Sequence, residues 1–181
     1  MRKAQLFSED IIFAIVLVLF TFSLWLILRD RVLSMISAGE TRRQLDEATS
    51  DALSQLLETS GNPANWNQLS TIDETTVASI GIASSRNTLD SDKIDKFINI
   101  SNSEGSNYTT IKRLLGLDRA GYKFNFTISS LDGVTLYDVS RLPSGELGNA
   151  SYASLNTTAF IERFALLNNS LVKVTLGVWI E

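Results

Sequence analysis

Six Asn-x-Ser/Thr triplets are the residues whose types and spacing point most directly to chemistry. The triplet is the acceptor for N-linked glycans, in which the Asn side chain carries the sugar. The chain has 12 Asn and 37 Ser plus Thr among 181 residues, from which chance predicts about two to three triplets. The excess predicts an external, glycosylated surface, and the alternative is a polar surface with fortuitous triplets. All six candidate acceptors follow residue 98: Asn99, Asn107, Asn125, Asn149, Asn156 and Asn168.

Two of these acceptors have a predicted setting. Asn125 falls on the polar side of an alternating strand, and Asn168 falls in a turn, where it should be the most accessible of the six. Trp66 is a further candidate, because it lies in the Asn-Pro-Ala-Asn-Trp turn at 62–66. It would be either a ligand platform or an anchor that packs this loop onto the core.

Other chemistries are excluded by composition. The chain has no Cys and no His, so disulfides, thiol nucleophiles, Cys/His zinc sites and Ser-His-Asp triads cannot form. Asp90, Asp92 and Asp95 lack the EF-hand spacing and indicate the solvated start of a helix. A net charge of −4 disfavours nucleic-acid binding, which depends on Lys and Arg contacts to phosphate. We expect no catalytic residue, no metal and no cofactor.

The elements that carry these residues begin with a long apolar run. Ile11–Leu28 has 16 apolar residues out of 18 and no charge. As a helix it would be about 27 Å long, close to the thickness of a bilayer's hydrocarbon core. The run therefore predicts a transmembrane helix, since the rest of the chain is too small to enclose it as a core helix. A secretory signal is disfavoured because such runs are usually about 7–15 residues long and a small-x-small cleavage site follows them.

The residues before the run resemble the class III signal peptide of archaeal type IV prepilins. The family pattern is Q-x-S-x-E-x-x-x-L, and Gln5 and Glu9 match its first and fifth positions. Phe7 stands where Ser is usual, and Phe13 where Leu is usual. The resemblance implies that a prepilin peptidase cuts between Ala4 and Gln5 while the apolar helix stays on the mature chain. Removing Arg2 and Lys3 in the leader would change the net charge from −4 to −6.

The resemblance also implies a role for Glu9. In pilins the glutamate at this position is thought to pair with the new amino terminus of a neighbouring subunit. A carboxylate inside a bilayer costs about 2.5–3.5 kcal/mol, so this pairing would favour leaving the membrane for a filament. The alternative is that Glu9 and Asp10 cap the helix, whose dipole favours acids at its amino terminus.

The resemblance further implies an organisation and a set of partners. The segments are a cleaved leader (1–4), a hydrophobic transmembrane and assembly helix (5–28), an amphipathic continuation (29–60) and an extracellular head (61–181). The partners are the prepilin peptidase, other pilin subunits, the pilus assembly platform and the membrane. A head of about 120 residues favours a minor subunit, because major pilins usually have smaller heads. The alternative is a membrane-anchored or filament-tip adhesin that does not form the filament body.

Orientation is predicted from flanking charge. Arg2 and Lys3 favour a cytoplasmic amino terminus and an external head by the positive-inside rule. Four arginines on the other side weaken that prediction: Arg29, Arg31, Arg42 and Arg43.

The helix is expected to continue beyond the membrane and to pack on the head. Apolar residues recur at helical spacing, and the Gly and Pro of the segment 59–63 predict its end. A helix from Leu6 to Glu58 would be roughly 80 Å long. The residues expected to face the head are Leu45, Ala48, Ala52, Leu53, Leu56 and Leu57.

The rest of the chain predicts an α+β fold, with short helices followed by an antiparallel sheet of about four strands. The helices are expected over Asp73–Ile80, Ser91–Ile100 and Ser106–Leu115, the last ending at Gly116. Two hairpins are expected, one around Asp132-Gly133 and one around residues 168–170. Their strands are Tyr122–Ser129, Val134–Ser140, Phe160–Leu167 and Leu171–Ile180, and a loop is expected over 142–156.

Overall fold

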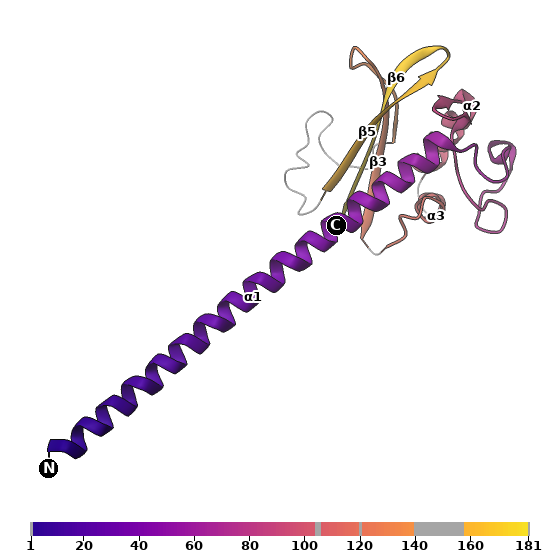
Figure 1. Cartoon of the computed structure of the whole chain (residues 1–181). Helices are drawn as coiled ribbons and strands as arrows, with labels where there is room; N and C mark the ends of the chain where they lie inside the picture. Colours follow the sequence, from indigo (N-terminus) through magenta and orange to yellow (C-terminus); the bar gives the residue numbers. More distant parts are fainter. Residues whose placement is uncertain (1, 104–105, 120, 140–157, 181) are drawn as a thin grey trace. The chain divides into compact units, whose positions relative to one another are not determined.

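The computed structural model describes residues 2–103, 106–119, 121–139 and 158–180 (Figure 1). The chain divides into two compact units, residues 1–41 and 42–181, and the first helix contributes to both. The expected α+β class is confirmed. The elements are α1 (Arg2–Glu58), the short 3-10 helix η1 (Trp66–Gln68), β1 (Ala83–Ser85), β2 (Thr88–Leu89), α2 (Ser91–Asn102), α3 (Ser106–Leu114), β3 (Tyr122–Ser130), β4 (Thr135–Val139), β5 (Thr158–Leu167) and β6 (Ser170–Ile180).

The last four turns of α1 form part of the head's core. Leu45, Leu53, Leu56 and Leu57 are fully buried, as the three- and four-residue spacing predicts. Thr49 is buried among them, and its Oγ1 hydroxyl donates to the Leu45 carbonyl at 2.7 Å. This helix is therefore a structural element of the head and not only a tether.

The end of α1 is fixed by side chains of its last two turns. The amide Nε2 of Gln55 donates to the carbonyl oxygens of Ile80 (3.0 Å) and Leu114 (2.9 Å), so it joins two otherwise separate segments. One carboxylate oxygen of Glu58 lies 3.4 Å from Arg163 on β5, and the other lies 3.4 Å from Arg86. These contacts give the end of α1 one position within the head.

The predicted helix over Asp73–Ile80 is wrong, because this segment is a turn. The Oδ1 atom of Asp73 accepts hydrogen bonds from the backbone amides of Thr75 and Thr76, both at 2.9 Å. The Thr75 hydroxyl donates to the same oxygen at 2.6 Å, and these bonds lower the pKa of Asp73. An acid that begins a helix can also close an Asx turn, and here the turn forms.

The two later helices match their predictions. Asp90 caps α2 by accepting from the amides of Asp92 (3.0 Å) and Lys93 (3.3 Å). α3 ends in a Schellman motif: Gly116 has a φ of 71°, and the Leu117 amide donates to the Lys112 carbonyl at 2.8 Å. The sequence indicated the start of α2 and the end of α3 correctly, because each depends on one local residue type.

In the part of the chain that the structure describes, the sheet has six strands in the order β1-β2-β5-β6-β3-β4. The two expected hairpins form. Asn168 and Asn169 close β5–β6 with φ values of 51° and 65°, the signature of a type I′ turn. The prediction of an antiparallel sheet of about four strands is wrong in two respects: β1 and β2 extend it, and β2 pairs with β5 in parallel.

The inner face of β3 packs on α2 and α3. Phe97 of α2 lies edge-on to Phe126, with ring centroids 5.2 Å apart. Tyr108 of α3 stacks on Phe124 at 5.1 Å, and its hydroxyl accepts from the Phe124 amide at 3.0 Å. The expected alternation along β3 is therefore confirmed on the core side.

Candidate membrane-spanning and assembly helix

The apolar first half of α1 is the main candidate for a functional surface. From Ile11 to Ile36 its large apolar side chains are 38–71% exposed. Within the described residues, one helix is long and apolar enough to cross a membrane, and its most apolar 18-residue stretch has a mean hydropathy of 3.0. Because the exposed side chains lie on every side, this segment needs an apolar environment all round.

The two hydroxyl side chains inside the apolar run are satisfied by the helix itself. The Thr21 hydroxyl donates to the Leu17 carbonyl, and the Ser23 hydroxyl donates to the Leu19 carbonyl, each at 2.8 Å. An unsatisfied polar group in hydrocarbon costs several kcal/mol. These internal bonds therefore make the run compatible with a lipid environment.

The carboxyl end of the apolar run has the features of an interfacial boundary. Trp25 stacks on Phe22 with ring centroids 5.9 Å apart, and the Arg29 guanidinium lies 5.7 Å from the Trp25 ring. Trp at the boundary of a spanning helix and a cation beyond it are typical of the headgroup region. The residues that follow, Asp30 and Arg31, are charged.

Ala4, Gln5 and Glu9 lie in the helical part of α1. Their side chains lie outside the described part, so only the backbone locates them. Positions four apart share one face of a helix, and Gln5 and Glu9 are therefore neighbours on one turn. Residue 9 therefore follows the expected new amino terminus at Gln5 by one helical turn, about 6 Å along the helix axis.

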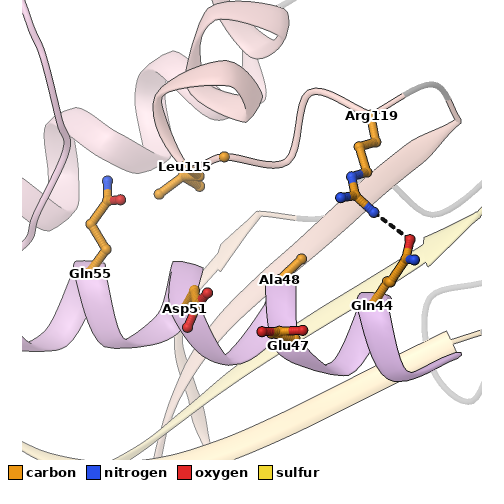
Figure 2. A pocket seen from close by; sticks show the side chains of 8 residues that line it. Gln44, Glu47, Ala48, Asp51, Gln55, Leu115 and Arg119 are labelled. Carbon is orange, nitrogen blue, oxygen red and sulfur yellow. Dashed lines mark hydrogen bonds between the residues drawn. The ribbon is translucent and has the colours of Figure 1, made fainter. Parts of the chain in front are cut away.

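A groove lies between α1 and the segment after α3 within the head (Figure 2). Its volume is about 410 Å³. The Arg119 guanidinium crosses one end and donates to the Gln44 side-chain oxygen at 2.5 Å, while Glu47 and Asp51 point from α1. Within the described ranges no three His, Cys, Asp or Glu side chains gather as metal ligands would. The groove has mixed charge and no assigned chemistry.

Trp66 does not form an exposed platform. Its side chain is fully buried, and its Nε1 donates to the Gly81 carbonyl at 2.9 Å. The interpretation of Trp66 as a binding residue is therefore wrong, and the alternative of a loop anchor is confirmed. Without a Trp66 surface, the adhesin hypothesis loses its candidate binding residue.

The structure describes four of the six candidate glycan acceptors. Asn99 on α2, Asn107 on α3 and Asn168 in the β5–β6 turn are exposed. Asn125 is 8% exposed, and its Oδ1 accepts from the Thr127 hydroxyl at 3.2 Å, so the expectation that its strand face is open is wrong. Asn149, Asn156 and the expected loop over 142–156 lie outside the described residues.

Lys93 is a buried cation that sequence reasoning missed. Its Nζ donates to the carbonyl oxygens of Ser60 (2.9 Å) and Ala83 (3.3 Å), so it ties the α1 exit to β1. Burial lowers the pKa of Lys93, and the nearby Asp90 partly opposes this. The sequence signal for its burial is its position beside Ile94 and Phe97, on the apolar side of α2.

No protein-family model matches the sequence, no curated protein matches it, and no solved structure matches the fold.

Proposed function

We propose that this chain is a pilin-like subunit, of the minor class, of an archaeal type IV pilus-like surface filament. Before assembly its N-terminal helix holds it in the membrane as a single-pass protein, with the amino terminus in the cytoplasm and the head outside. Its partners are a prepilin peptidase, other pilin subunits, the assembly platform and the membrane. It has no enzymatic activity, and its head is N-glycosylated.

One observation carries this proposal: a single helix is lipid-compatible in its first half and part of a folded head's core in its second half. Residues 11–36 expose their apolar side chains, whereas Leu45, Leu53 and Leu56 of the same helix are fully buried. A subunit that first resides in a membrane and then packs its helix among copies needs such a division. The pairing groups would be the new amino terminus at Gln5 of one subunit and the Glu9 carboxylate of its neighbour.

Amino-terminal sequencing of the membrane-bound protein tests processing. The proposal expects the mature chain to begin at Gln5. A chain that begins at Met1 contradicts processing and leaves a plain membrane anchor.

Glu9→Ala tests assembly, and Asp10→Ala is the matched control. Both variants should be retained in membranes after carbonate extraction, because the apolar run is unchanged. Only Glu9→Ala should be missing from sheared surface filaments, since it removes the carboxylate that pairs with the amino terminus. Filaments that contain Glu9→Ala at the wild-type level contradict the assigned role.

A further inference from the structure

Among the described sequons, backbone conformation separates Asn168 from the others. A glycosyltransferase must bind the Asn side chain and the hydroxyl two residues later. In a helix these side chains point about 200° apart, and Asn99 and Asn107 lie inside α2 and α3. The Asn107 amide also donates to the Ser103 hydroxyl at 3.0 Å. Asn125 is buried on β3, which lies between β6 and β4 in the sheet.

Asn168 has none of these obstacles. It is exposed, it lies at the first position of a two-residue turn with a φ of 51°, and the hydroxyl-bearing Ser170 is also exposed. Within the described part of the chain, its side chain makes no hydrogen bond. The amide is therefore presented at the end of a hairpin, where a transferase can reach it without unfolding the head.

An exposed apolar surface lies beside this turn. Leu166 pairs with Leu171 in the second pair behind the turn, and Phe164 lies two residues further along the same face of β5. Ser130 of β3 pairs with Val172, so the next residue, Leu131, follows at the same end of the sheet. The β3–β4 turn and the β5–β6 turn lie at this end (Figure 1). These four residues, here called the tip patch, are 44–61% exposed.

The tip patch combines four large apolar side chains at one end of the sheet, with Lys173 paired to Phe164 at its border. A half-exposed Phe alone leaves roughly 100 Å² in water, and three leucines add to it. The largest contiguous apolar surface of a protein, typically a few hundred Å², is often functional. A pyranose ring has an apolar face of C–H groups, so the glycan of an adjacent Asn is an occupant of suitable chemistry.

We propose that Asn168 carries an N-linked glycan whose first sugars cover the tip patch. The Nδ2 atom of Asn168 forms a bond to the anomeric carbon of a sugar held on a polyprenyl phosphate or diphosphate carrier. The anomeric carbon–oxygen bond breaks, the lipid-linked phosphate leaves with its electron pair, and a transferase base takes the amide proton. This inference rests on the external, N-glycosylated head of the proposed function, and it names the acceptor and the surface that the glycan covers.

Glycopeptide mass spectrometry of the full-length protein, purified from the membranes of the cells that produce it, tests the modification. Ser170→Ala removes the sequon while keeping Asn168 in its turn, and Ser170→Thr is the matched control that retains the sequon. The peptide containing Asn168 should carry glycan mass in the wild type and in Ser170→Thr, and should lose it in Ser170→Ala. An unmodified Asn168 in the wild type overturns the proposal. Equal occupancy at Asn99 or Asn107 overturns the conformational argument.

Carbene footprinting of the same samples tests the covering. Labelling of Leu166 and Leu171 should rise several-fold in Ser170→Ala relative to Ser170→Thr. Phe160, near the other end of β5 and comparably exposed, should label equally in both. Equal labelling of Leu166 and Leu171 overturns the covering.

Both readouts are independent of filament formation. A glycosylated chain that begins at Met1 would contradict only prepilin processing. A chain that begins at Gln5 without a glycan at Asn168 would contradict this inference and leave prepilin processing intact.

Discussion

Leu53→Ala tests whether α1 is part of the head's core. Leu53 is fully buried, and a Leu→Ala change at such a position removes apolar contacts and leaves a cavity, at a cost of about 3–5 kcal/mol. For a unit the size of the head, each kcal/mol lowers the melting temperature by about 4 °C. We therefore expect Leu53→Ala to melt roughly 10–20 °C below the wild type.

Leu33→Ala is the matched control, because it makes the same change on the same helix where the side chain is 52% exposed. It should leave the melting temperature of the head unchanged. Tryptophan fluorescence of the full-length protein in detergent reports this transition, since Trp66 and Trp179 are fully buried in the head. Equal melting of Leu53→Ala and wild type, or an equal loss in Leu33→Ala, would refute the assignment of α1 to the core.

Three further predictions concern the segments around this helix. Gly81→Ala should destabilise the head severely, because a Cβ there would lie 2.1 Å from the Thr59 carbonyl oxygen. A Cβ at Gly39 meets no atom within 4 Å, so Gly39→Ala should raise the helicity that circular dichroism measures. Lys93 has a folded pKa below its ordinary 10.5, so the free energy of unfolding should rise as pH rises towards 10.5. This rise should be smaller in Lys93→Met. Denaturant titrations at each pH would measure it. Asp73 has a folded pKa below its ordinary 3.8; its contribution should be lost as pH falls below that value, and Asp73→Asn should flatten the acid limb of the melting profile.

The features predicted correctly from sequence are those that depend on neighbouring residues. Helical spacing identified the buried face of α1, Gly116 indicated the end of α3, and Asn168-Asn169 indicated the β5–β6 turn. In each case one residue type has a conformational preference that no competing contact opposes.

The features that were missed depend on contacts between distant segments. The segment Asp73–Ile80 is a turn because Val77 and Ile80 pack into the core without helical geometry. β2 has only two residues, and its parallel pairing with β5 joins residues 88 and 166, so no local pattern indicates it. Alternation showed which side of β3 Asn125 occupies, but not that this side is covered.

In the candidate site, too, local features were predicted and features that depend on distant contacts were not. Composition alone identified the apolar run, and the structure adds that its hydroxyl groups are bonded within the helix. The sequence left Trp66 as either a platform or a loop anchor, and its bond to the Gly81 carbonyl fifteen residues away decides for the anchor. Lys93 was missed because a lysine beside an apolar helical face usually extends to solvent.

The first helix and the last strand contribute side chains to the same core, and this restricts when the head can fold. The core combines Leu45 and Leu53 of α1 with Val174 and Leu176 of β6, and β6 lies between β5 and β3 in the sheet. More than a hundred residues separate α1 from β6, which is on the order of ten seconds of synthesis. During that interval the apolar face of residues 45–57 lacks the part of the core that β6 supplies. The core of the head is therefore incomplete until β6 has been synthesised.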